Sequence, residues 1–194
     1  KTKSTPHGSI DYPVHPISVA IGAEVSFVAR CVDVDVKFQQ EVLRRAAAHR
    51  GTAFVEIYQD CNVYNHDAFD YASDRQTRDD HVIYLEHGKP MIFGRQRDRG
   101  IRLRGTTPEI VALADLASID ELLVHDERSA EPTLAYLLSR MRHPEFPEPM
   151  GVFRAVERPT YEQLLIDQVQ QVRARLGPGD LDALFNEGDT WEVA

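Results

Sequence analysis

The residue best placed for metal or redox chemistry is Cys61, which follows a run of strand-forming residues. Phe54, Val55, Ile57 and Tyr58 are the β-branched and aromatic types that fill buried strands. Polar residues come next, so Cys61 is expected just beyond the carboxyl end of a core strand. In open α/β sheets, ligands and cofactors bind beyond that end of the strands. Cys61 is therefore either a ligand of a metal centre or a loop cysteine without a role.

A single thiolate cannot hold a metal centre by itself. Zinc ions and iron–sulfur clusters usually have about four protein ligands. The sequence has no CxxC pair, and its one other cysteine, Cys31, lies inside the apolar run EVSFVARCV. Cys31 is expected to be a small core residue. A metal centre at Cys61 would need its other ligands from outside this chain.

No other pattern of a catalytic or metal site is present in the sequence. The 8 histidines show no HExxH spacing, and there is neither a GxSxG motif nor a P-loop. The acidic pairs Asp79–Asp80 and Asp120–Glu121 are expected to be solvated loop charges. No residue is therefore assigned to catalysis or to binding an organic cofactor.

The segment GRQRDRGIRLRG, residues 94–105, concentrates positive charge around a single acid, Asp98. Its arginines are Arg95, Arg97, Arg99, Arg102 and Arg104. A local basic patch of this kind can dock an acidic protein or a phosphate group. Alternatively, the segment is a hairpin whose arginines pair with acids elsewhere in the assembly. We favour the second interpretation.

The composition indicates a soluble globular protein. The 194 residues carry a net charge of −9, which argues against general nucleic-acid binding. No apolar run approaches the roughly 20 residues of a membrane span, and the first residues lack the apolar core of a signal peptide. The scarcity of cysteine suits a reducing, cytoplasmic compartment. The sequence starts without Met in an apparent loop, so we expect a preceding segment.

The elements that must position Cys61 follow a strand–helix–strand order. Residues 24–32 are expected to form a strand, 35–49 an amphipathic helix and 52–59 the next strand. Apolar strands joined by a helix predict an α/β fold, with a parallel sheet and flanking helices.

The rest of the sequence predicts a mixture of short elements. Two short strands are expected around the HGKP turn, and a third at GIRLRG. Helices are expected at 131–141 and 160–176, and a strand at 152–156. We therefore divide the chain into residues 1–73, half of an α/β layer fold, and residues 74–194, a mixed α+β C-terminal extension.

Several blocks of the sequence resemble a known family. They are KTKSTPHGSIDYPVHP, ISVAIGAEVSFVARCVDVD, GTAFVEIYQDCNVYN, LEHGKPMIFG and PMGVFRAVERPTYE. Together they are similar to the β subunit of 2-oxoacid:ferredoxin oxidoreductases, in particular to the 2-oxoglutarate type of actinobacteria. The resemblance covers nearly the whole chain, in order, and the stretch after Gly177 adds little to it.

The resemblance implies a subunit of an enzyme. This family binds thiamine diphosphate with Mg²⁺ and a [4Fe–4S] cluster. It decarboxylates a 2-oxoacid, passes two electrons singly to ferredoxin and releases an acyl-coenzyme A, and an α subunit completes its active site. By this resemblance, residues 1–73 would be the C-terminal half of the thiamine-diphosphate-binding domain. Residues 74–194 would be an extension that contacts the α subunit.

Cys61 matches the family cysteine that supplies the fourth ligand of the [4Fe–4S] cluster. The other three cysteines have no counterpart in this chain, and neither has the GD…N motif that holds Mg²⁺ and the diphosphate. Most ligands of these cofactors are therefore expected outside the chain, and Cys61 is the one site residue that the resemblance assigns. Its neighbours Asp60 and Asn62 are expected to tune the reduction potential of the cluster.

The expected function is that of a β-subunit fragment of a 2-oxoglutarate:ferredoxin oxidoreductase, which forms succinyl-coenzyme A. Two alternatives stay open. The substrate is pyruvate or another 2-oxoacid, because the residues that select it are expected upstream and on the α subunit. Or the isolated chain is a non-catalytic assembly fragment. Neither nucleic acid nor a membrane is expected as a partner.

Overall fold

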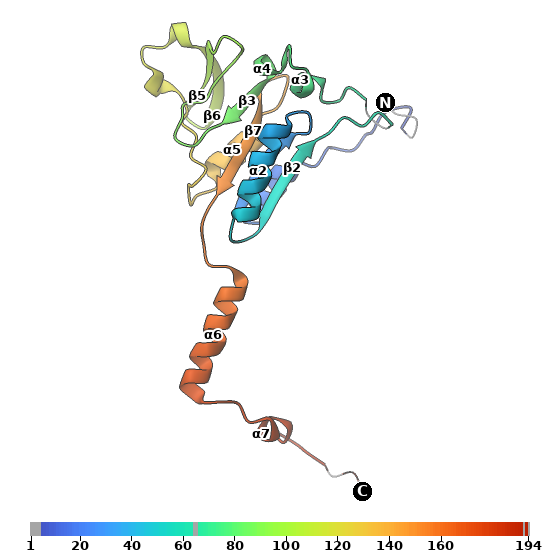
Figure 1. Cartoon of the computed structure of the whole chain (residues 1–194), viewed down its shortest axis with the longest axis vertical. Coiled ribbons are helices and arrows are strands. Elements are labelled where there is room, and N and C mark those ends of the chain that lie inside the picture. The colour runs from blue at the N-terminus through green and yellow to red at the C-terminus, as the bar shows by residue number, and fades with distance from the viewer. Residues whose placement is uncertain (1–4, 64–65, 192, 194) are drawn as a thin grey trace. The chain divides into compact units, whose positions relative to one another are not determined.

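The computed structural model describes residues 5–63, 66–191 and 193 (Figure 1). The chain forms two compact units, Lys1–Arg158 and Pro159–Ala194. Within the described residues, all strands lie in the first unit. No helix in the described part of the chain has the length and apolar character needed to cross a membrane.

A four-stranded sheet forms the centre of the first unit. Its strands, in spatial order, are β2 (Ala53–Tyr58), β1 (Phe27–Val32), β7 (Glu148–Ala155) and β3 (Val82–Leu85). β1 and β2 are parallel, with Val32 beside Tyr58 at their carboxyl ends. β7 runs antiparallel to β1 and parallel to β3. The predicted α/β fold with flanking helices is confirmed, but the sheet is mixed, because the strands contributed by the later part of the chain run against β1 and β2.

Helix α2 (Val36–Ala48) connects β1 to β2 and covers one face of the sheet (Figure 1). Asp35 caps its N-terminus, where the Asp35 side chain accepts a hydrogen bond from the Phe38 backbone N–H at 3.4 Å. Val42 is the buried residue of the helix. It packs against the alternate residues of β1 that face it, which are Phe27, Ala29 and Cys31.

Helices α1 (Pro16–Gly22) and α5 (Thr133–Arg140) pack on the opposite side of the sheet. Ile17 of α1, Leu138 of α5 and Val28 of β1 are all completely buried there. Successive residues of a strand point to opposite faces, so β1 contributes to both cores. All 6 of its residues are buried, which explains the continuous apolar run in the sequence.

Short elements link β2 to the far edge of the sheet and form a second sheet beyond it. Two short helices, α3 (Asp70–Ser73) and α4 (Arg78–His81), precede β3. The second sheet is antiparallel and consists of β4 (Ile92–Phe93), β5 (Arg99–Arg104) and β6 (Thr107–Ala112). Two 3₁₀ helices follow it, η1 (Leu113–Asp115) and η2 (Ile119–Glu121). The strands predicted around the HGKP turn are β3 and β4, and GIRLRG contributes to β5 as predicted.

The second unit contains helices α6 (Tyr161–Leu176) and α7 (Leu181–Phe185). The Thr160 hydroxyl caps α6 by accepting a hydrogen bond from the Gln163 backbone N–H at 3.3 Å, as the sequence predicted. The boundary between the two compact units lies after Arg158. The sequence predicts a different boundary, after residue 73, between part of a cofactor-binding domain and an extension. That boundary is defined by function rather than by compactness, and it stays a prediction.

Candidate functional site

Cys61 lies just beyond the carboxyl end of β2, and it is exposed. β2 ends at Tyr58, which pairs with Val32 at the end of the parallel strand β1. The loop that carries Cys61 therefore begins at the carboxyl edge of the parallel strand pair. This is the edge at which the sequence places it and at which α/β sheets bind ligands.

Cys31 has a different environment, because it is completely buried in β1. Burial raises the pKa of the Cys31 thiol to about 11, and the nearby charge of Asp35 contributes a smaller part of this increase. Its thiolate is therefore disfavoured at neutral pH. Cys31 is a core residue, as the sequence predicted, and it is not available as a second ligand beside Cys61.

Aromatic rings close the base of the loop that carries Cys61. Tyr58 precedes the loop and Phe69 follows it, and their rings stack with centroids 4.2 Å apart and planes 22° apart. Tyr71, two residues further on, stacks on the ring of His143 with centroids 4.3 Å apart. The two ends of the loop therefore meet over a short distance.

Asp60 organises the loop from within. Its Oδ1 accepts a hydrogen bond from the Asp67 backbone N–H, and its Oδ2 lies 2.8 Å from His66 Nδ1. The hydrogen bond to Asp60, and then the charge of Asp67, raise the pKa of His66 above its ordinary value. The carboxylate of Asp60 thus fixes the backbone of the loop next to Cys61 and also faces an imidazole.

Asp60, His66 and Asp67 place three ligand atoms within 4.8 Å of one another. Carboxylate and imidazole are ligands of divalent ions rather than of iron–sulfur clusters, which are held by thiolates. His66 and Asp67 are exposed, and their contacts with Asp60 are explained by loop closure. We assign no ion to this group.

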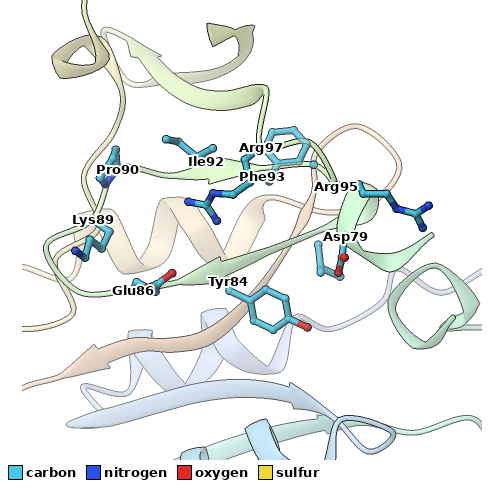
Figure 2. Close-up of a pocket in the computed structure, with 11 residues that line it drawn as sticks. Asp79, Tyr84, Glu86, Lys89, Pro90, Ile92, Phe93, Arg95 and Arg97 are labelled. Atoms are coloured by element: carbon cyan, nitrogen blue, oxygen red, sulfur yellow. The ribbon is translucent and has the colours of Figure 1, made fainter. Parts of the chain in front are cut away.

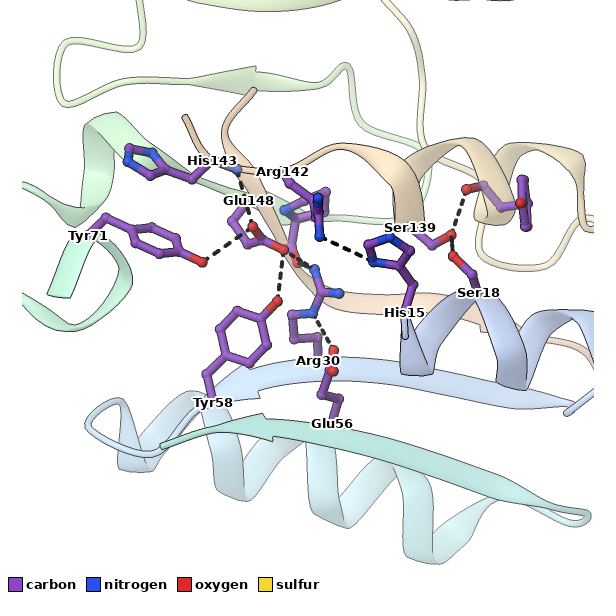
Figure 3. A network of polar contacts seen from close by, with 12 residues as sticks. His15, Ser18, Arg30, Glu56, Tyr58, Tyr71, Ser139, Arg142, His143 and Glu148 are labelled. Carbon is purple, nitrogen blue, oxygen red and sulfur yellow. Dashed lines mark hydrogen bonds and ion pairs between the residues drawn. The ribbon is translucent and has the colours of Figure 1, made fainter. Parts of the chain in front are cut away.

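Glu148 is a buried carboxylate that contacts residues on both sides of the loop (Figure 3). It lies at the start of β7 and is 1% exposed. The Tyr58 hydroxyl donates to its Oε1 at 2.9 Å, and the Tyr71 hydroxyl donates to its Oε2 at 3.4 Å. One carboxylate therefore holds the residue before the loop and a residue just after it.

Arg30 of β1 balances the charge of Glu148. It is also buried, and its Nη1 donates to Glu148 Oε1. Its Nε donates to Glu56 Oε2 at 2.7 Å. Arg30 and Glu56 are paired in the register of β1 and β2, so their side chains share one face of the sheet. Buried charges of this kind require partners and hydrogen bonds, and this network supplies both.

Burial raises the pKa values of the Tyr58 and Tyr71 hydroxyls above their ordinary values. Both hydroxyls therefore remain protonated near neutral pH and act as donors to Glu148. Sequence reasoning missed this network. One signal was available: Arg30 is a lone charge inside the apolar run FVARCV, and a buried charge needs a partner. Its partner Glu148 lies in the Pro-rich segment HPEFPEP, residues 143–149, and the strand predicted at 152–156 begins after this segment.

The arginine-rich segment divides into paired and unpaired residues. Arg99 Nη2 lies 2.7 Å from Asp80, and Arg104 Nε lies 2.9 Å from Glu109. Arg102 pairs with both Glu109 and Glu121. These pairs support the hairpin interpretation, although the acids are in this chain rather than elsewhere in an assembly. Among the described residues, no acid forms an ion pair with the two remaining arginines, which are Arg95 and Arg97.

A cavity of about 620 Å³ opens between β3 and the segment that forms β4 and the following turn (Figure 2). Lys89, Arg95 and Arg97 contribute positive charge to its lining, and Asp79 and Glu86 contribute negative charge. Figure 2 shows the charged ends of Lys89 and Arg95 on opposite sides of the view. The cations do not converge on one point, and we assign no ligand to the cavity.

Comparison with known proteins identifies the class of protein that this chain resembles. No family model matches the sequence. Relatives are β subunits of 2-oxoacid:ferredoxin oxidoreductases, such as 2-oxoacid:ferredoxin oxidoreductase subunit beta of Saccharolobus solfataricus. That protein is 40% identical over 65 residues, which are 34% of this chain and 21% of the relative. The predicted resemblance to this class of subunit is confirmed.

One relative matches almost the whole of this chain. The 2-oxoglutarate oxidoreductase subunit KorB of Mycobacterium tuberculosis is 42% identical over 195 residues, covering 99% of this chain and 52% of the relative. The chain thus spans about half the length of this relative.

A solved structure supports the fold. It is 2-oxoglutarate:ferredoxin oxidoreductase from Magnetococcus marinus, with a TM-score of 0.58 and 18% sequence identity. The match covers 98% of this chain and 50% of that chain. At this identity it shows the fold alone, and it agrees with the predicted α/β class.

Proposed function

We propose that this chain is part of the β subunit of a cytoplasmic 2-oxoglutarate:ferredoxin oxidoreductase. The observation that carries the proposal is the 42% identity to KorB over 99% of the chain. The Magnetococcus enzyme, which shares the fold, is described with 2-oxoglutarate, coenzyme A and succinyl-coenzyme A bound. The proposed reaction converts 2-oxoglutarate and coenzyme A into succinyl-coenzyme A and CO₂, and its two electrons reduce ferredoxin.

The proposed enzyme uses thiamine diphosphate with Mg²⁺ and a [4Fe–4S] cluster. The first cofactor supplies an electron sink for decarboxylation, and the cluster supplies a carrier of single electrons. Cys61 fits the part of one cluster ligand, because it is exposed and follows a core strand at the carboxyl edge of the sheet. Cys31 is buried, so the other cluster ligands would come from outside this chain. No described residue is assigned to thiamine diphosphate or Mg²⁺.

The residues of this chain would act by holding the ligand loop. Glu148 binds Tyr58 and Tyr71 on either side of it, and the ring of Phe69 closes it against Tyr58. A ligand on a loop fixed at both ends keeps its position when the charge of the cluster changes. This rigidity favours rapid electron transfer, because little structure has to rearrange.

The proposal includes an α subunit that completes the active site. Residues 1–73 would form half of the thiamine-diphosphate-binding domain, and residues 74–194 an extension that contacts the α subunit. The names of several relatives as β subunits support the existence of such a partner. By itself, the 194-residue chain would be a non-catalytic assembly fragment.

A second candidate is the same reaction on pyruvate or another 2-oxoacid. It is favoured by the relatives from Saccharolobus and Sulfolobus, which are named for 2-oxoacids in general. The described residues of this chain contain no group that we can assign to selecting the substrate side chain.

Turnover of several 2-oxoacids tests the proposal. The complete β subunit, produced together with its α subunit, is supplied with coenzyme A, oxidised ferredoxin and either 2-oxoglutarate, pyruvate or 2-oxoisovalerate. We expect kcat/KM for 2-oxoglutarate to exceed that for the others at least about tenfold. A preference for pyruvate would select the second candidate. A complex loaded with its cofactors that turned over none of the three would refute both.

A further inference from the structure

Basic side chains from three separate elements gather around His15 (Figure 3). His15 directly precedes α1, Arg142 follows α5, and Arg30 lies in β1. Arg140, the last residue of α5, completes this group, which we call the basic cluster. Burial is the largest cause that lowers the pKa of His15, and the charges of the three arginines lower it further. The fold therefore concentrates positive charge around one imidazole.

The basic cluster lies at the carboxyl edge of the sheet, where α/β folds bind ligands. The His143 backbone N–H, next to Arg142, donates to Glu148 Oε2 at 3.3 Å. The hydroxyl of Tyr58, at the carboxyl end of β2, donates to the same carboxylate. The cluster therefore shares this edge with the loop of Cys61, although other residues form it.

Several hydrogen-bond donors of the basic cluster lack acceptors. Arg142 Nη1 donates to His15 Nδ1 at 3.3 Å, so His15 is neutral and carries its proton on Nε2. Arg30 donates through Nε to Glu56 and through Nη1 to Glu148, and its Nη2 forms no hydrogen bond within the described residues. Figure 3 shows the guanidinium groups of both arginines on the side of Glu148 that faces His15. An anion bound there would accept hydrogen bonds from all three side chains.

The charge of the basic cluster favours a dianion. Arg30 is balanced by Glu148, whereas Arg140 and Arg142 are exposed, and no acid of the described chain pairs with them. A phosphate monoester carries about −1.5 to −2 charges near pH 7 and three acceptor oxygens, which matches two unpaired arginines. One carboxylate carries a single charge and two oxygens. A diphosphate bound through Mg²⁺ requires oxygen ligands for the ion, which exposed arginines do not supply.

We propose that the basic cluster binds the 3′-phosphate of coenzyme A. Among the substrates of the proposed reaction, coenzyme A alone carries a phosphate monoester. The identity of the ligand therefore rests on the proposed function, whereas the site rests on the contacts of this chain. Arg142, the Nη2 of Arg30 and the Nε2–H of His15 donate to the phosphate oxygens. Arg140 acts through its charge.

Binding of inorganic phosphate to the full chain tests the site without turnover. The ¹⁵N NMR signals of the His15 ring, assigned with His15→Gln, should shift and saturate as phosphate is added. Arg142→Gln should weaken this binding at least about tenfold, because a charge-assisted hydrogen bond is lost. Arg50→Gln is the control, since it removes the same charge from an exposed arginine that precedes β2 at the opposite edge of the sheet. It should change binding less than about twofold, because salt screens distant charges.

The identity of the ligand is tested with the complete β subunit and its α subunit. Arg142→Gln should raise KM for coenzyme A at least about tenfold. KM for dephospho-coenzyme A, which lacks the 3′-phosphate, should rise less than about threefold, because the lost contact is absent from that complex. KM for 2-oxoglutarate should stay the same. An equal rise for the two coenzymes, or a rise for 2-oxoglutarate alone, would overturn the assignment to the 3′-phosphate.

The two experiments separate failure of the inference from failure of the proposed function. The site is wrong if the His15 signals do not respond to about 50 mM phosphate at constant ionic strength, which keeps screening equal. It is also wrong if Arg142→Gln and Arg50→Gln weaken phosphate binding equally. Both results are independent of the activity of the complex. A loaded complex that turns over no 2-oxoacid would refute the proposed function, and the assignment to coenzyme A with it.

Discussion

The rings of Tyr58 and Phe69 stack with centroids 4.2 Å apart, and they thereby join the end of β2 to the far end of the loop that carries Cys61. The loop's position thus depends on residues that are separated from Cys61 in sequence but meet beneath it. Glu148 adds a second connection, because it accepts hydrogen bonds from Tyr58 and from Tyr71. The candidate site is therefore a rigid support for one exposed thiol.

Removing the ring of Phe69 is expected to loosen the loop. A stacked aromatic pair contributes about 0.5–1.5 kcal/mol beyond its buried area. In Phe69→Ala, the Asp67 amide, which donates to Asp60, should therefore exchange its hydrogen roughly two to ten times faster. Tyr136→Ala, at a partly exposed ring on α5, serves as the control. Unchanged exchange at Asp67 would show that the stack does not hold the loop.

Glu148→Ala is expected to destabilise the first unit strongly, because it leaves Arg30 buried with Glu56 as its remaining acid. Breaking a buried pair by removing one partner costs about 3–5 kcal/mol. The free energy of unfolding, measured with urea, should fall by about 3 kcal/mol. The exposed pair Arg44–Glu41 provides the contrast, and Glu41→Ala should cost less than about 1 kcal/mol. Similar losses in the two variants would mean that burial does not govern the Glu148 network.

Acid is expected to weaken the fold through His125. This side chain is completely buried, its Nε2 donates to the Val152 carbonyl at 2.8 Å, and its Nδ1 has no hydrogen-bond partner among the described residues. Burial lowers the pKa of His125 below its ordinary value. The unfolded chain therefore binds a proton at higher pH than the folded chain does, and stability falls as the pH drops below about 6.5.

The replacement His125→Gln isolates this effect. Glutamine can still donate to Val152, but it does not titrate. Between pH 6.5 and 5.5, the original chain should lose up to about 1 kcal/mol more free energy of unfolding than the variant, because the unfolded histidine is already half protonated at about pH 6.5. Other histidines contribute equally to both proteins. Two parallel pH profiles would exclude His125 as a source of acid sensitivity.

Asp60 should influence the reduction potential of a cluster bound at Cys61. Asp60→Asn removes a negative charge beside the proposed ligand while keeping an oxygen that can accept from the Asp67 amide. The reduced cluster carries one more negative charge, so we expect a potential that is higher by tens of millivolts. A potentiometric titration followed by EPR measures it. An unchanged or lower potential would contradict the electrostatic role of Asp60.

The elements around Cys61 could be predicted because their causes are local. Apolar runs identify β1 and β2, periodic apolar residues identify α2, and a polar break after Tyr58 places Cys61 at the edge of the sheet. The direction of β7 and the pairing of Arg30 with Glu148 could not be predicted in this way. These two residues are 118 positions apart, and single-sequence periodicity carries no information about which distant strands become neighbours.

Iron content and low-temperature EPR test whether Cys61 is a ligand of a [4Fe–4S] cluster. The complete β subunit, produced with its α subunit, is compared with its Cys61→Ser variant after reduction. We expect a [4Fe–4S] signal in the original protein that is lost or altered in Cys61→Ser. An unchanged signal in the variant would contradict the assignment of Cys61, and the absence of iron from both proteins would contradict the proposed function itself.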